Sequence, residues 1–189
     1  AVSTACKGHV ADAGSQGEIE SIMMSPGSTG NWTLVADSWD PKAHGTFTLD
    51  VQELSKPSND TCASAKVIAF PMGASKLTTT GYTFAATNNV SLSKSDCTKN
   101  TTSGPDVFYQ LKLEKGKTYK LKLDGKGFNE AMYLFTSCTY VSSTCNSGMG
   151  ADLSTTKAEE ISITPSATLN YYIAVDGRSS TDSGPYTLT

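Results

Sequence analysis

The chain has 189 residues, a formal net charge of −3 and 17% charged residues. This length allows one or two domains. Acidic and basic residues are mixed along the chain, without a basic stripe for nucleic acid or a polybasic patch for a membrane surface. No charged-then-apolar signal peptide opens the chain, and no apolar run approaches the roughly 20 residues that span a bilayer. We therefore expect neither nucleic acid nor a membrane as a partner.

The first part of the chain is expected to hold a loop and three short strands. Residues 1–16 lack periodicity, and the strands are predicted at 18–24, 31–37 and 46–52. In the second of them, Trp32, Leu34 and Ala36 fall on one face. Residues 53–59 are polar and interrupted by proline, which is typical of a linker.

Short strands are also expected in the rest of the chain. The expected elements are an apolar strand at 65–70, a threonine-rich pair of strands around Gly81 within 76–86, a polar loop at 87–105, and strands at 131–136, 159–164, 170–176 and 184–189. Apolar residues alternate with polar ones at 107–113 and at 119–123, which predicts a β-hairpin with one buried face. About eight or nine short strands without a helix predict an all-β fold, an antiparallel β-sandwich of jelly-roll type.

The first fifty residues are a second copy of the last fifty. Residues 1–50 align with 140–189 at a constant offset of 139 positions, without gaps. Identical pairs include Val2/Val141, Cys6/Cys145, Glu20/Glu159, Ile22/Ile161, Pro26/Pro165, Asn31/Asn170, Asp37/Asp176, Gly45/Gly184, Thr48/Thr187 and Leu49/Leu188, and conservative pairs include Trp32/Tyr171, Leu34/Ile173 and Phe47/Tyr186. The agreement predicts a repeat, of which the chain holds one complete unit and the second half of another.

This organisation predicts two domains of unequal completeness. Residues 1–55 would be the C-terminal half of a preceding repeat with its linker, and residues 56–189 the complete unit. Half a sandwich exposes an apolar sheet face and unpaired strand edges. We therefore expect residues 1–50 to pair with the missing half (a cleaved piece of a longer precursor), with a second copy, or with the complete domain. The alternative is a natural chain whose first repeat is degenerate.

The cysteines indicate an oxidising compartment. Five cysteines, four of them in the complete unit, predict a secreted protein, extracellular or periplasmic. Four cysteines allow three pairings, and the repeat favours Cys62–Cys97 with Cys138–Cys145, which leaves Cys6 as a free thiol or without its partner. Metal binding by these thiols is disfavoured, because no C-x-x-C pair exists and neither histidine lies near a cysteine.

Several segments of the complete unit occur in the order and spacing of a known family. They are NDTCA at 59–63, GPDVFY at 104–109, FNEAMYL at 128–134, YYIAVDG at 171–177 and GPYTL at 184–188. On these segments, residues 59–189 resemble the bacterial pre-peptidase C-terminal domain, and residues 17–50 resemble the end of a second such domain. Many members of the family have aspartate at the position of Asn129.

The resemblance implies a β-sandwich attached to secreted proteases and other exported enzymes, often in tandem and removed by processing. It also implies roles in secretion, solubility and adhesion, calcium binding in some relatives, and no catalytic residues. We therefore expect a non-catalytic secreted accessory module from the C-terminal region of an exported protease or other hydrolase, aiding secretion, stability or adhesion. The alternative is a module that binds a carbohydrate, such as a polysaccharide, or a protein surface.

Enzymatic motifs are absent from the sequence. There is no H-E-x-x-H, no G-x-S-x-G and no Gly-rich phosphate loop. His9 and His44 lie in the partial copy and have no counterparts in the complete unit, so we expect them to be surface residues. We expect no enzyme, and no catalytic or cofactor-binding residues.

Four aspartates are candidates for calcium binding. Asp37 and Asp176 occupy equivalent positions after a strand and before a turn, where an Asx-turn is the favoured interpretation. Calcium takes six to eight oxygen ligands, so Asp60 and Asp106 would contribute only if the fold brings them together. We predict no metal-ligating residues and no cofactor, with calcium as the one candidate ion.

Aromatic residues and sequons give weaker signals. Trp32, Trp39, Tyr140 and Tyr171 are candidates for a platform that stacks on sugars, although Trp32 and Tyr171 align with each other, which suggests a shared core position. Asn31, Asn59, Asn89 and Asn100 each begin an N-x-Ser/Thr sequon. Because the family resemblance is bacterial, we expect these asparagines to be unmodified.

Overall fold

The computed structural model describes residues 29–38, 40–42, 44–125, 127–145, 150–151 and 157–189. The chain divides into two units, Ala1–Val51 and Gln52–Thr189. Cys6, His9, Trp39 and the strand predicted at 18–24 lie outside the described residues.

The described part of the first unit contains no strand. The strands predicted at 31–37 and 46–52 are therefore wrong, and no strand pairing in the described part of the chain involves these residues. Their apolar side chains are exposed, Trp32 to 52% and Phe47 to 73%. A strand is stable when neighbouring strands satisfy its backbone and another layer covers its apolar face. The described residues of the first unit have no such paired neighbours.

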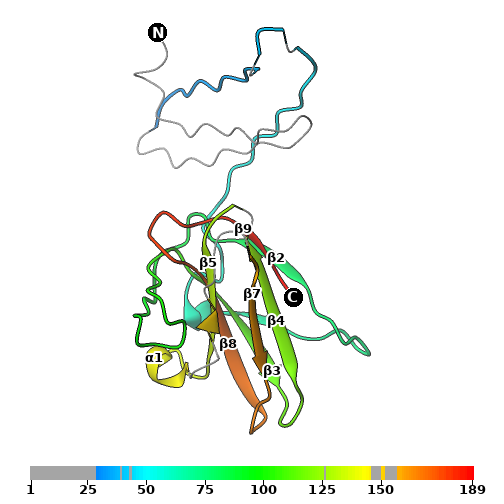
Figure 1. Ribbon diagram of the computed structural model, residues 1–189, viewed down its shortest axis with the longest axis vertical. Helices are drawn as coiled ribbons and strands as arrows, with labels where there is room; N and C mark the ends of the chain where they lie inside the picture. Colours follow the sequence, from blue (N-terminus) through cyan, green and yellow to red (C-terminus); the bar gives the residue numbers. More distant parts are fainter. Residues whose placement is uncertain (1–28, 39, 43, 126, 146–149, 152–156) are drawn as a thin grey trace. The chain divides into compact units, whose positions relative to one another are not determined.

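The second unit is a sandwich of two sheets (Figure 1). The five-stranded sheet has the order β1 (Lys66–Ile68), β3 (Val107–Leu113), β8 (Leu169–Gly177), β5 (Glu130–Phe135) and β6 (Gly150–Ala151). The four-stranded sheet has the order β2 (Thr79–Tyr82), β9 (Pro185–Leu188), β4 (Tyr119–Gly125) and β7 (Glu159–Ile163). All paired strands are antiparallel except β1 and β3. The predicted all-β sandwich is confirmed, with two short helical turns, η1 (Cys62–Ser64) and α1 (Val141–Thr144).

Strands β3 and β4 lie in different sheets, so the predicted hairpin is wrong. β3 pairs with β1 and β8, whereas β4 pairs with β7 and β9. The connection between them turns at Gly116, whose φ of 77° suits glycine. Alternating apolar residues determine which face of a strand is buried, but not which strand it pairs with. Leu111 and Leu123 are both buried, although they come from opposite layers.

Residues 76–86 form one strand instead of the predicted pair. β2 runs through Gly81 and pairs along its length with β9. The Cβ atom of any larger residue at position 81 would lie 2.4 Å from the Tyr186 hydroxyl oxygen and 3.0 Å from the Tyr109 hydroxyl oxygen. This glycine therefore gives space to two tyrosine side chains and does not mark a turn.

Both faces of the five-stranded sheet are buried around its central strands. The buried apolar residues of these strands are Val107, Phe108, Tyr109, Leu111, Leu113, Ala131, Met132, Tyr133, Leu134, Phe135, Tyr171, Ile173, Ala174 and Val175. Residues 87–105 attach to this sheet through the Ser103 and Gly104 N–H groups, which donate to the Gly177 carbonyl at 3.2 and 2.9 Å. The polar loop predicted from sequence thus covers part of a sheet.

The four cysteines of the complete unit form two disulfides, Cys62–Cys138 and Cys97–Cys145. The pairing predicted above, Cys62–Cys97 with Cys138–Cys145, is therefore wrong. The Cα–Cα distances are 5.7 and 5.6 Å, within the range that a disulfide spans. The bridges connect η1 to the segment after β5, and the loop before β3 to the residue after α1. The repeat was a poor guide to the pairing, because it does not show which cysteines the folded chain brings together.

Candidate functional site

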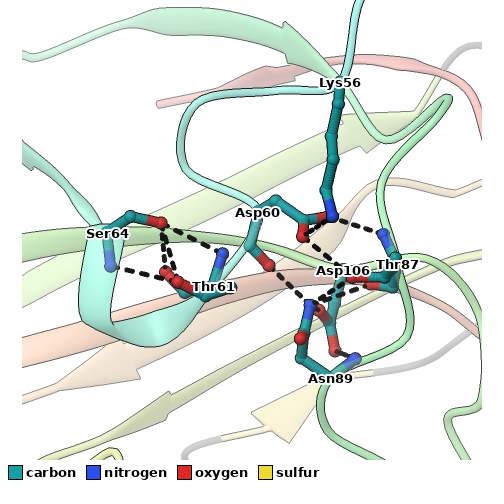
Figure 2. A network of polar contacts seen from close by, with 7 residues as sticks. All are labelled: Lys56, Asp60, Thr61, Ser64, Thr87, Asn89 and Asp106. Atoms are coloured by element: carbon teal, nitrogen blue, oxygen red, sulfur yellow. Dashed lines mark hydrogen bonds and ion pairs between the residues drawn. The ribbon is translucent and has the colours of Figure 1, made fainter.

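A network of polar side chains fastens the start of the second unit to the sandwich (Figure 2). The Lys56 ammonium lies 2.6 Å from Asp60 Oδ2, and the Thr87 hydroxyl donates to the same oxygen at 2.8 Å. The Thr87 N–H donates to Asp60 Oδ1. Burial alone would raise the pKa of Asp60, but the hydrogen bonds and the charge of Lys56 hold it below its ordinary value. Asp60 is therefore an ionised carboxylate with its own cation.

Asp106 occupies the other side of the same network. Its Oδ2 accepts the backbone N–H groups of Asn89 and Val90 at 3.0 and 2.7 Å. The Asn89 side-chain amide donates to Asp106 Oδ1 at 3.2 Å and to the Asp60 carbonyl at 2.6 Å, which links the two aspartates (Figure 2). Asp106 is fully buried, and burial raises its pKa to about 7.

The fold thus brings Asp60 and Asp106 together, but donors within the protein occupy both carboxylates. Lys56 and Thr87 bind Asp60, while Asn89 and Val90 bind Asp106. Within the described ranges, no three His, Cys, Asp or Glu side chains are grouped so that they could hold a metal ion. The donor set is that of a structural hydrogen-bond network and does not resemble a calcium cage, which needs six to eight oxygens.

The two aspartates that the repeat makes equivalent have different surroundings. Asp37 is exposed and accepts the N–H of the next residue, Ser38, at 2.8 Å, whereas the predicted Asx-turn would accept the N–H two residues on. Asp176 lies inside β8, so the turn prediction is wrong for this residue. It is buried and accepts the Tyr133 hydroxyl at 3.0 Å. Burial, together with the negative charge of Asp106, raises the pKa of Asp176 well above its ordinary value.

The predicted aromatic platform is not assembled within the second unit. Tyr171 is buried in the core, whereas Tyr140 is 66% exposed. Trp32 belongs to the first unit and is exposed, so the shared core position inferred from its alignment with Tyr171 holds for Tyr171 alone. His44 is exposed and contacts only the Lys42 carbonyl, at 2.9 Å, among its described hydrogen bonds.

Two of the four sequon asparagines use their side-chain amides within the protein. Asn59 is 8% exposed and donates to the Phe108 carbonyl at 3.0 Å, so its nitrogen is not free for a glycan. Asn89 donates to the aspartate network described above. Both asparagines hold loops to strand β3 or to the segment before it, which is a structural role.

A polar pocket of about 180 Å³ opens between the edge strands β1 and β2. It is lined by Ser58, Lys66, Thr80, Tyr82, Tyr109 and Tyr186, together with Gly81 and the neighbouring Pro57 and Asn59. The Tyr109 and Tyr186 hydroxyl oxygens are 2.7 Å apart, with the rings at 87°. Each tyrosine is 2% exposed. Burial, followed by the presence of Tyr109, raises the pKa of Tyr186, which keeps its hydroxyl protonated.

An apolar cavity of about 220 Å³ lies further along the same two edge strands. Ile68 of β1 and Thr79 of β2 line it, with Phe70, Leu111 and Leu121. The Phe70 and Tyr119 rings, both in its lining, are 6.0 Å apart. The side of the sandwich between β1 and β2 therefore changes from polar to apolar along the strands.

Sequence reasoning missed the pair of tyrosines and the Lys56–Asp60 contact. One signal was present in the repeat, where Tyr186 aligns with Phe47. Tyr186 therefore carries a hydroxyl that the residue aligned with it by the predicted repeat lacks. No local pattern pointed to Tyr109, because it fits the apolar alternation of its strand.

The second unit is a two-sheet β-sandwich with a buried aspartate network and two pockets beside β1 and β2. Residues 58–176, more than half of the chain, match the family GBD_T9SS_assoc, described as galactose binding domain-like. The chain therefore belongs to this family, which supports a non-enzymatic accessory module. No curated protein matches the chain. Neither helix in the described residues has the length and apolar character needed to cross a membrane.

Among solved structures, the chain is similar to the pre-peptidase C-terminal domain of a collagenase from Bacillus anthracis. The identity is 13%, the match covers 66% of this chain and 92% of that domain, and the TM-score is 0.41. Neither comparison tests the repeat in residues 1–50 or the predicted domain boundaries, which stay predictions.

Proposed function

We propose that the chain is a carbohydrate-binding accessory module of an exported protein. The observation that carries this proposal is the match of residues 58–176 to a galactose binding domain-like family. Binding would hold the parent protein at a polysaccharide surface, which is the adhesive form of the accessory role expected from sequence. A protease or other hydrolase is the proposed parent, because the resemblance of the motifs is to domains attached to such enzymes.

Export is supported by two independent features. The second unit carries two disulfides, which persist in oxidising compartments. The name of the matched family refers to T9SS, and we propose that the parent protein is exported by this system. The module would then work outside the cytoplasm, attached to or released from its parent.

The proposal is tested by electrophoresis of the whole chain in gels that contain soluble polysaccharides, including galactose-rich ones. We expect at least one galactose-containing polysaccharide to slow the protein, while bovine serum albumin in the same gel moves as it does without polysaccharide. Migration that no polysaccharide changes would contradict carbohydrate binding and leave only the accessory class.

A second candidate, binding to a protein surface, has an observation of its own in the first unit. Its exposed apolar side chains include Trp32, Leu34, Val35, Phe47, Leu49 and Val51, at 52–85% exposure. By the repeat, Trp32, Leu34, Phe47 and Leu49 are equivalent to core residues of β8 and β9. We propose that strands from outside residues 1–50 cover them, from a cleaved piece or a second copy.

A further inference from the structure

We propose that the polar pocket between β1 and β2 binds one sugar residue, with the hydroxyl pair of Tyr109 and Tyr186 as its floor and Lys66 and Thr80 at its rim. This inference rests on the proposed carbohydrate-binding function and specifies where that function is carried out.

The two tyrosine hydroxyls have more hydrogen-bonding capacity than their mutual contact uses. Each hydroxyl has one hydrogen to donate and lone pairs to accept with. One hydrogen is used in the 2.7 Å contact between Tyr109 and Tyr186, and the other needs a different acceptor. No other described side chain or backbone group makes a hydrogen bond to either hydroxyl. Both groups line the pocket, so the remaining donor and the remaining lone pairs are available to a ligand there.

The contact between the two tyrosine hydroxyls depends on a glycine in strand β2, although glycine is a poor strand former. Glycine weakens the interior of a strand, yet Gly81 lies within β2 opposite Tyr186. Its missing side chain is what allows the Tyr186 hydroxyl to approach, since a Cβ atom would lie 2.4 Å from that oxygen. Gly81 thus leaves the space that the Tyr186 hydroxyl occupies beside the Tyr109 hydroxyl.

The lining of the pocket indicates the chemical class of the ligand. Lys66 is the only charged residue among the lining residues, and no carboxylate is present, so a cation is disfavoured. Lys66 contributes N–H donors, while Ser58 and Thr80 contribute hydroxyls that both donate and accept. Adjacent hydroxyl groups that also donate and accept are the complement of such a surface, and sugars present them. The volume of about 180 Å³ far exceeds the roughly 10–15 Å³ that one water molecule needs, so the pocket has room for a ligand much larger than water.

The aspartate network is a weaker candidate for the same ligand. Asp60 and Asp106 already accept hydrogen bonds from Lys56, Thr87 and Asn89 (Figure 2), and Asp106 also accepts one from the Val90 N–H. A sugar would have to displace these internal donors, whereas at the tyrosine pair it would meet hydroxyls with capacity to spare.

The test is a titration of the whole ¹⁵N-labelled chain with galactose, glucose and galacturonate, followed by NMR. We expect saturable shifts of the Lys66, Gly81 and Tyr82 amide resonances with at least one sugar. Tyr186→Phe should weaken that binding about tenfold, as expected for loss of one hydrogen bond to the ligand. The matched control is Tyr171→Phe, a buried tyrosine outside the pocket, which should leave the affinity unchanged. If galacturonate causes larger shifts than the two neutral sugars and added salt reduces those shifts, the carboxylate of galacturonate binds Lys66.

The outcomes separate the pocket from the proposed function. Shifts elsewhere on the sandwich, or retention by polysaccharide that Tyr186→Phe does not change, would overturn the pocket and leave carbohydrate binding intact. No shifts and no retention would overturn both, and the pocket would then hold water only. Tyr109→Phe provides a second removal of a hydroxyl, and thermal unfolding of each variant shows that a loss of binding is not a loss of fold.

Discussion

The carboxyl groups of Asp60 and Asp106 belong to one network, yet their pKa values are displaced in opposite directions. Burial acts on both, but only Asp60 has an ammonium group beside it. For Asp106, burial exceeds the effect of the hydrogen bonds from Val90 and Asn89, and the nearby charge of Asp60 adds to the rise. Ionisation of Asp106 near neutral pH would place a second negative charge in a buried site.

A pH-dependent loss of stability follows from Asp106. Its folded-state pKa of about 7 exceeds the ordinary value of 3.8, so the folded protein holds a proton that the unfolded chain releases. The stabilisation is complete below the unfolded pKa and is lost as the pH rises through about 7, at up to about 1.4 kcal/mol per pH unit. We expect the free energy of unfolding in urea to fall from pH 4 to pH 7.

The variant Asp106→Asn should flatten this pH dependence. Asparagine keeps an oxygen that accepts the Asn89 and Val90 N–H groups but does not titrate. The exposed Asp50→Asn is the control and should retain the slope of the natural chain. An unchanged slope in Asp106→Asn would assign the pH dependence to another buried carboxyl, such as Asp176.

Gly81→Ala should destabilise the second unit by about 1–3 kcal/mol, because the new methyl group would lie 2.4 Å from the Tyr186 hydroxyl oxygen. Adding Tyr186→Phe removes the nearest atom and should recover part of the loss; the ring carbon at 2.7 Å prevents full recovery. Urea unfolding of the single and double variants measures both effects. Full stability of Gly81→Ala would show that β2 moves away from Tyr186 without cost.

At the scale of elements, the two disulfides connect loops and helical turns that lie outside the paired strands. Cys62–Cys138 joins residues 76 positions apart and Cys97–Cys145 residues 48 positions apart. On the chain-entropy model each bridge stabilises by about 4 kcal/mol. We expect the paired replacement Cys97→Ser with Cys145→Ser to reduce the free energy of unfolding by that order, and Cys62→Ser with Cys138→Ser likewise.

The connectivity itself is checked by mass spectrometry of peptides from the unreduced protein. We expect linked peptides that contain Cys62 with Cys138, and Cys97 with Cys145. A linked pair that contains Cys62 with Cys97 would contradict the structure and restore the pairing inferred from sequence.

The elements show why sequence predicted some features and missed others. The burial of Leu111, Leu113, Leu121 and Leu123 follows from local alternation, which sequence records directly. The pairing of β3 with β8 joins residues far apart in the chain, and no local pattern encodes it. The same limit affected the disulfides and the Tyr109–Tyr186 contact, because each depends on which strands become neighbours.

In the first unit, the local sequence pattern predicts strands that the described structure does not contain. Its sequence carries the alternation of two strands, such as Phe47 and Leu49, but the described structure has no strand there. The strands of the second unit that the predicted repeat aligns with it, β8 and β9, are each flanked by two others in their sheets. A strand-like sequence without such neighbours exposes its apolar residues, as Phe47 and Leu49 do at 73% and 55%.

At the scale of the whole molecule, the second unit should fold without the first. Its described core residues all lie within 92–188, and its two disulfides are internal to it. We expect residues 52–189, produced alone, to unfold at the same temperature as the second unit within the whole chain, and to bind polysaccharide equally well. A lower unfolding temperature would show that residues 1–51 stabilise the sandwich.

The first unit should make the whole chain associate where residues 52–189 do not. Its exposed apolar side chains, including Phe47, Leu49 and Val51, form a surface that water disfavours, and covering it gains free energy in proportion to the apolar area. In sedimentation velocity we expect the whole chain to form dimers or larger species at micromolar concentration, and Phe47→Ser with Leu49→Ser to reduce them. Intact mass with and without reduction identifies any peptide or second chain held through Cys6. A monomeric whole chain that binds no apolar dye would contradict the proposal that strands from outside residues 1–50 complete this unit.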